Sequence, residues 1–199
     1  MATLAIAAGM ITATAVGTTS IAEWSRTAEP PVVSERTPPT PAETPAKELR
    51  SGRDRSDVAP AEARVPVGGL QYVPISPYRT LDSRAFGDDG DMFPDREVWF
   101  DVWTDANGNP RIPSDIKAVS YNLTVTDTLG GGGYLALYPA DQLWPGNSSI
   151  NWFGTGLDLA NGGIVAVGNF DGPGEVAVYA GAVPDTATFF ILDITGYFI

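Results

Sequence analysis

The chain has 199 residues, of which 43% are hydrophobic and 10% aromatic, enough for one core plus an additional segment. It contains neither cysteine nor histidine, which excludes disulfides, thiolate metal sites and acid–base catalysis by histidine. The formal net charge is −12, and residues 67–199 carry 16 acidic against 5 basic residues. Because such a surface repels phosphate, we do not expect nucleic-acid binding.

Residues 2–22 form a stretch without any charged residue. A secretory signal is one interpretation, but it normally begins with Lys or Arg, and neither occurs before Arg26. A transmembrane helix fits the length, although five threonines and two glycines dilute the segment. We favour a third interpretation, in which residues 1–22 are an apolar arm that binds a partner protein, and keep the signal or anchor as the alternative.

Residues 23–67 are rich in Pro, Glu, Arg, Ser and Ala and poor in large apolar groups. This composition predicts a semi-rigid spacer or an extended arm that orders on a partner, with polyproline geometry favoured around its prolines. A short helix is expected over 42–53. Since few apolar groups are available to dock on a core, we expect this spacer and the following domain to fold independently.

Residues 116–139 organise the domain expected over 68–199. Val119, Leu123 and Val125 alternate with polar residues, as in a strand with one buried side. Four consecutive glycines, 130–133, follow, and a second apolar run ends at Pro139. We interpret the whole segment as a long β-hairpin.

Further strands are expected along the domain, with turn residues between them. The segment 171–174, DGPG, predicts a hairpin turn, and the apolar stretch 186–198 predicts a central strand covered on both faces. The predicted fold is an all-β antiparallel sandwich of seven to nine strands, jelly-roll or Ig-like, after an extended Pro-rich N-terminal arm. The other expected strands are 70–75, 97–103, 148–153, 164–170 and 175–179.

Acidic loops suggest one possible cofactor, Ca²⁺. The carboxylates of Asp88, Asp89 and Asp91 lie in one loop with Asp95, but without a full ligand spacing, so a solvated acidic turn is the favoured interpretation. The segment 105–110, DANGNP, has partial calcium-loop spacing and is better explained as a turn. No cofactor is otherwise expected.

Catalysis is not expected, because the acidic residues lie mostly in turns and no nucleophile–base pair is possible without histidine. A carbohydrate hydrolase with two carboxylates remains the catalytic alternative. Aromatic residues suggest a binding surface instead, and the candidates are Trp144, Tyr138 and Trp152. Tryptophans also plug the ends of sandwiches, which we favour for Trp99 and Trp103.

Several motifs in one order resemble a known β-domain. The segment 77–84, PYRTLDSR, resembles the P-x-R-x-x-D-[ST]-R opening of a domain found in secreted actinobacterial proteins and in virion proteins of their phages. The segments 118–126 (AVSYNLTVT), 148–153 (SSINWF) and the ending 193–198 (DITGYF) follow in the expected order. The resemblance covers about 71–198 and departs in the acidic loop 85–95.

The resemblance implies a non-catalytic display or adhesion module with no ligand to carry over. Arg79, Asp82 and Arg84 suit a structural ion-pair cluster better than a ligand site. We therefore expect a non-enzymatic virion protein, a capsid decoration or minor tail component, that residues 1–66 attach to other virion proteins within an oligomeric assembly. The alternative is a secreted or envelope-anchored module that binds a cell-surface glycan.

Overall fold

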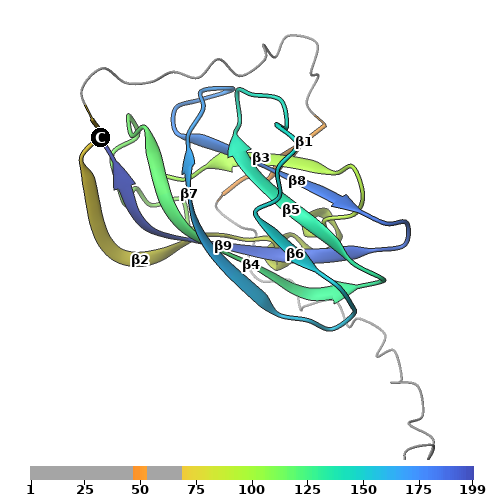
Figure 1. The fold of residues 1–199 in the computed structure, drawn as a ribbon. Helices are drawn as coiled ribbons and strands as arrows, with labels where there is room; N and C mark the ends of the chain where they lie inside the picture. The colour runs from red at the N-terminus through yellow and green to blue at the C-terminus, as the bar shows by residue number, and fades with distance from the viewer. Residues whose placement is uncertain (1–46, 53–68) are drawn as a thin grey trace, which may run out of the picture. The chain divides into compact units, whose positions relative to one another are not determined.

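Two antiparallel sheets pack face to face in the computed structural model, which describes residues 47–52 and 69–199 (Figure 1). This confirms the predicted all-β sandwich. One sheet contains, in spatial order, β1 (Arg50–Ser51), β3 (Glu97–Asp101), β8 (Glu175–Ala182), β5 (Gly133–Pro139) and β6 (Ile150–Trp152). The other contains β2 (Tyr72–Asp82), β9 (Ala187–Phe198), β4 (Ala118–Leu129) and β7 (Leu159–Ala166). A 3₁₀ segment, η2 (Ser83–Gly90), follows β2.

The core lies between the sheets and is built from alternating side chains. Val119, Leu123 and Val125 of β4 are fully buried, as their period of two predicts. Val98 and Phe100 of β3 close the core from the opposite sheet, so the inner faces of both sheets are apolar. Within the described ranges, no helix has the length and apolar character to cross a membrane.

The predicted hairpin over 116–139 is wrong, because β4 and β5 belong to different sheets. Gly130 and Gly132 have positive φ angles of 83° and 133°, which glycine adopts without strain, and they carry the chain from one sheet to the other. A Cβ on Gly133 would lie 2.6 Å from the ring of Trp152, so this crossing also needs a residue without a side chain. A glycine run permits either a tight turn or an arch, and packing selects the arch here.

The other strand predictions have mixed outcomes. The hairpin predicted at 171–174 is limited to one antiparallel bridge between Gly168 and Glu175. The strands on either side of it, β7 and β8, belong to different sheets, so they do not form a hairpin. The edge strand expected over 70–75 is longer and forms β2, at the edge of the four-stranded sheet. β9 lies centrally between β2 and β4, and its successive residues Phe189 and Phe190 are both buried, as predicted for a strand covered on both faces.

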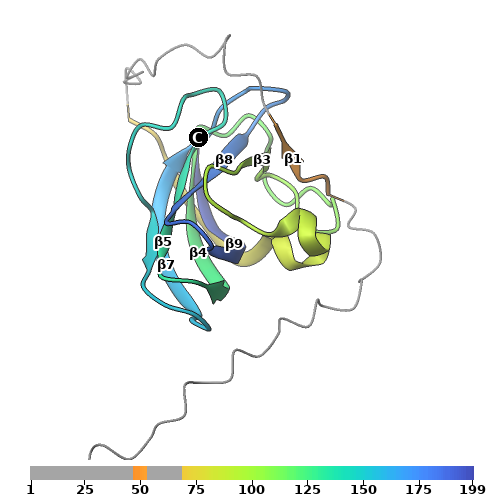
Figure 2. The ribbon, with the colours of Figure 1, turned by 90° about the vertical axis from the view of Figure 1, so that its right-hand side faces the viewer.

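Residues 47–52 belong to the folded unit, although they lie within the predicted spacer. β1 lies beside β3 (Figure 2) and pairs with it antiparallel, with Arg50 opposite Trp99 and Ser51 opposite Val98. In the described part of the helix expected over 42–53, no residue is helical, and Arg50–Ser51 is a strand. The expected independence of spacer and sandwich is also wrong for this segment, which we call the strap. The segment 1–22 and the remaining spacer residues lie outside the described residues.

Candidate functional site

The outer face of the five-stranded sheet carries a row of aromatic side chains. Along β3, Trp99 points away from the core because its neighbours Val98 and Phe100 point into it. β8 pairs with β3 on one side, where Tyr179 lies opposite Glu97. On its other side β8 pairs with β5, where Gly181 lies opposite Tyr134. The strand period thus places aromatic and carboxylate groups together on one surface.

Three aromatic rings form a continuous stack on this face. The ring of Trp144 lies 4.7 Å from that of Tyr179 at 22° and 5.8 Å from that of Tyr134 at 30°. Trp144 comes from the loop after β5, where its indole Nε1 donates a hydrogen bond of 2.9 Å to the carbonyl of Asn147. Trp144 and Tyr134 remain half-buried, so part of the stack is accessible to solvent.

Gly181 is required beneath this stack. A Cβ built on Gly181 would lie 2.1 Å from Cζ of Tyr134, because the tyrosine ring lies directly across the neighbouring strand. We expect Gly181→Ala to displace Tyr134 and change the near-ultraviolet circular dichroism of the stack, at a cost of roughly 1–3 kcal/mol. Gly69→Ala, at an open position, is the control. An unchanged aromatic spectrum in Gly181→Ala would contradict the proposed contact.

A cavity of about 570 Å³ adjoins the stack. Tyr179 forms part of its wall, and the tyrosine hydroxyl donates a hydrogen bond of 2.6 Å to Asp95. Glu97 accepts a hydrogen bond from the hydroxyl of Tyr138. The cavity is lined by Ser51, Gly52, Phe93, Asp95, Arg96, Glu97 and Tyr179. Aromatic faces beside carboxylates and a hydroxyl are the groups that carbohydrate sites use.

The structure separates the three aromatic residues predicted for binding. Trp144 lies in the stack, and Tyr138 lies on the same face but is only 2% exposed. Trp152 lies in the interior core with no exposed surface, so it is not available to a ligand. Sequence analysis missed Tyr134 and Tyr179, although the alternation in 175–182 (EVAVYAGA) places Tyr179 on the face opposite Val178.

The acidic loop over 85–95, for which a solvated turn is the favoured interpretation, gives no support to the Ca²⁺ alternative. Asp88 and Asp89 are exposed on η2, and no group of three or more acidic side chains in the described ranges is suitable for a metal ion. The guanidinium of Arg96 instead donates hydrogen bonds to the backbone carbonyls of Asp89 and Asp91, the latter at 3.0 Å. An arginine of the chain therefore supplies the positive charge at this loop.

The segment 105–110 is a hydrogen-bonded turn, as its composition predicts. Oδ1 of Asp105 accepts hydrogen bonds of 3.0 Å from the backbone N–H groups of Asn107 and Asn109. Desolvation of Asp105 opposes ionisation, but these hydrogen bonds outweigh it and hold the pKa of the carboxyl below its usual value. Most donors to Asp105 are thus groups of the turn itself, and Arg111 adds an ion pair at 3.5 Å.

Arg79, Asp82 and Arg84 come together as an ion-pair cluster. Nη2 of Arg84 lies 2.7 Å from Oδ2 of Asp82, and Nη1 of Arg79 lies 3.2 Å from the same oxygen. Burial opposes ionisation of Asp82, but hydrogen bonds and charge from Arg84, with the charge of Arg79, hold its pKa below the usual value. Arg79 also pairs at 3.0 Å with Asp193 on β9, so the cluster joins the two ends of the domain.

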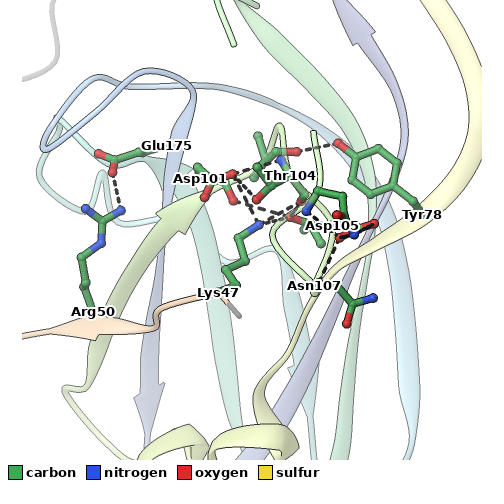
Figure 3. A network of polar contacts seen from close by, with 11 residues as sticks. Lys47, Arg50, Tyr78, Asp101, Thr104, Asp105, Asn107 and Glu175 are labelled. Atoms are coloured by element: carbon green, nitrogen blue, oxygen red, sulfur yellow. Dashed lines mark hydrogen bonds and ion pairs between the residues drawn. The ribbon is translucent and has the colours of Figure 1, made fainter. Parts of the chain in front are cut away.

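The strap is fastened by two basic side chains (Figure 3). Nζ of Lys47 donates hydrogen bonds to Oγ1 of Thr80 at 2.6 Å and to the carbonyl of Thr104 at 3.0 Å, and lies 3.5 Å from Oδ1 of Asp101. Arg50 pairs with Asp171 at 3.1 Å and with Glu175. Sequence analysis missed this network, because its partners are up to 125 residues apart.

Lys47 is 5% exposed, and its burial has a consequence for pH dependence. Desolvation lowers its pKa from 10.5 to about 8, against the opposing influence of Asp101. Between these values the undocked lysine binds more protons than the docked one, so docking becomes more favourable as pH rises through the window. Burial raises the pKa of Tyr78, so stability is lost again once tyrosine ionises in the unfolded chain, above about pH 10.

We therefore expect the free energy of unfolding to rise by about 1–2 kcal/mol more between pH 7 and pH 9.5 in the native chain than in Lys47→Met. Urea unfolding of both chains at the two pH values measures this difference. Equal pH dependence in both chains would show that Lys47 keeps an ordinary pKa when docked.

Neither a family model, nor a curated protein, nor a solved structure matches this chain.

Proposed function

We propose that the protein is a non-enzymatic display module that binds carbohydrate on the outer face of its five-stranded sheet. The observation that supports this proposal is the partly exposed stack of Tyr134, Trp144 and Tyr179 beside a cavity lined by carboxylates. The C–H faces of a sugar ring pack on aromatic rings, and its hydroxyls donate hydrogen bonds to carboxylates. The stack and the cavity offer both kinds of contact side by side.

The charge of the domain narrows the ligand class. Residues 67–199 carry 16 acidic and 5 basic residues, so the field of the domain opposes anionic polymers such as polyphosphates and uronic-acid chains. Asp95 and Glu97 add two carboxylates at the cavity, against one guanidinium from Arg96. Neutral or amino-substituted oligosaccharides are therefore the ligands that we propose.

Glycan-array screening followed by calorimetry on the strongest oligosaccharide tests this proposal. We expect Trp144→Ala to weaken binding by about tenfold or more, because an aromatic anchor in a binding site contributes roughly 1–2 kcal/mol. The matched control is Phe153→Ala, which removes an aromatic ring that is 84% exposed and lies outside the stack. An array without any binder, or equal affinities of the two variants, would disprove carbohydrate binding on this face.

The same screen separates binding from hydrolysis. Asp95 and Glu97 both line the cavity, so a carbohydrate hydrolase is the alternative that deserves a direct assay. We expect bound oligosaccharides to be recovered intact after long incubation. Cleavage products that disappear in Glu97→Gln would overturn the non-enzymatic part of the proposal.

We further propose that the module is displayed on a virion. The support is the order of segments in the sequence, in which an uncharged stretch and a Pro-rich spacer precede the acidic domain. Mass spectrometry of purified particles tests this location, with peptides from 2–22 expected in the virions. Absence from particles, or a mature chain that begins at Glu23, would favour the secreted or envelope-anchored alternative.

A further inference from the structure

We propose that the groove along the outer edge of β3 is an interaction site for a second copy of this chain, and that it accepts residues 47–52 of that copy in the place of its own strap. The groove consists of the edge of β3 and the side chains that bind Lys47 and Arg50. This inference does not rest on carbohydrate binding, although Ser51 and Gly52 of the strap also line the cavity beside the aromatic stack.

The sandwich positions the groove's acceptors without help from the strap. Oδ1 of Asp101 accepts hydrogen bonds from the backbone N–H of Thr104 at 3.0 Å and from its hydroxyl at 2.7 Å. Oγ1 of Thr80 donates to the carbonyl of Thr104 at 2.8 Å. The receptor for the Lys47 ammonium is therefore a preorganised set of oxygens, which remains in place when the lysine leaves.

The receptor for Arg50 is preorganised in the same way. Oδ2 of Asp171 accepts a hydrogen bond of 2.8 Å from the indole Nε1 of Trp99, and Oε2 of Glu175 accepts one of 2.8 Å from the backbone N–H of Asp171. The guanidinium carbon of Arg50 lies 6.0 Å from the centre of the Trp99 ring. The groove thus recognises an extended segment with a lysine and an arginine three residues apart.

Charge complementarity identifies the occupant as this basic segment. The strap contains Lys47, Glu48 and Arg50, a net positive charge, whereas residues 67–199 are strongly acidic. Its β-pairing covers only two residues, so ion pairs, hydrogen bonds and the packing of Leu49 against the core are the other described contacts that hold it. An identical segment from another copy makes identical contacts, so exchange costs no contact energy.

The chain connection sets how far the strap can reach from its own domain. Residues 53–68 join the strap to β2, and sixteen residues span at most about 55 Å when extended. In dilute solution the chain's own strap has the advantage of an effective concentration of roughly millimolar. Exchange should therefore become appreciable when copies are concentrated to that level, as in an ordered assembly.

Complementary single cysteines test this proposal in the full chain, which has no natural cysteine. Ser51 and Val98 are direct partners in the pairing of β1 with β3, so cysteines at these positions lie within disulfide range. One chain carries Ser51→Cys and a differently tagged chain carries Val98→Cys, and the two are mixed under mild oxidation. A mixed disulfide between the two tags forms only if a strap docks on another copy.

We expect the yield of the mixed disulfide to rise with protein concentration. Adding Lys47→Glu and Arg50→Glu to the Ser51→Cys chain should reduce that yield about tenfold or more, because both anchors are then repelled by the groove. Only the Val98→Cys chain, whose groove receives the strap, has to remain folded in this comparison. It is the same chain in both mixtures, so its groove does not differ between them.

The double variant Ser51→Cys/Val98→Cys is the positive control, since it should form an intrachain disulfide. An intrachain disulfide in this control, without any mixed disulfide up to millimolar concentration, would overturn exchange. A mixed disulfide that is insensitive to charge reversal would also overturn it, because the contact would then be non-specific. If the double variant forms no intrachain disulfide, the strap does not dock on β3 as described, and the inference loses its basis.

Discussion

Leu123→Ala is expected to lower the free energy of unfolding by roughly 2–5 kcal/mol. Leu123 lies in the middle of β4, is fully buried, and is covered by strands on both sides, β7 and β9. Removing its side chain leaves a cavity between two sheets whose backbones are fixed by their hydrogen bonds, so little collapse can relieve the loss. Urea or thermal unfolding of the two chains measures the difference.

The neighbouring residue provides the control for this prediction. Thr124 follows Leu123 on the same strand, points to the opposite face and is only partly buried. Its hydroxyl lies 3.3 Å from Nδ2 of Asn122, a contact within the same strand. Thr124→Ala should therefore cost less than about 1 kcal/mol. Similar losses in both variants would show that the outer face of β4 is covered as fully as the inner face.

The comparison of β4 with β5 shows how far alternation predicts the fold. The period of two predicts which side chains over 119–125 are buried, because it depends only on strand geometry, but Thr126, which it places on the polar face, is buried as well. It does not predict the strand's neighbours, since a run of four glycines permits both a hairpin and an arch. In the structure β5 pairs with β6 and β8 instead of β4, and both of these partners come later in the sequence.

The candidate site illustrates the same limit. Trp144 lies in a loop between Leu143 and Pro145, and this position alone favours exposure. Trp152 looks similar in composition, but its strand, β6, places it on the inner face, and only the pairing with β5 decides this. The cavity joins residues from the strap, the loop before β3, and β8, and such a combination is not visible in any single sequence segment.

The strap was missed for a different physical reason. Linker composition indicates that a segment cannot bury enough apolar surface to fold alone. Lys47 and Arg50 dock instead through hydrogen bonds and ion pairs with partners such as Asp101 and Glu175, and Glu175 is only 1% exposed in the docked structure. A polar segment can thus become part of a fold when its partners would otherwise be buried charges without a counter-ion.

Two truncations should therefore have very different effects on stability. We expect deletion of residues 1–46 to leave the unfolding midpoint of the domain nearly unchanged, because Lys47, Arg50 and β1 all remain in place. Deletion of residues 1–52 should lower the midpoint by about 5–15 °C, which corresponds to roughly 2–4 kcal/mol for a domain of this size. It removes the cations paired with Asp101 and Glu175 and uncovers the edge of β3.

Calorimetry of the two truncated chains at one pH and salt concentration measures this contrast. The full chain with Lys47→Glu and Arg50→Glu separates the role of the anchors from that of chain length, and its midpoint should fall about as far as that of the longer deletion. The fall follows because each reversed charge faces the carboxylates that its native residue neutralised. Equal midpoints for the two truncations would mean that the strap contributes no stability, and its contacts with the sandwich would then be energetically neutral.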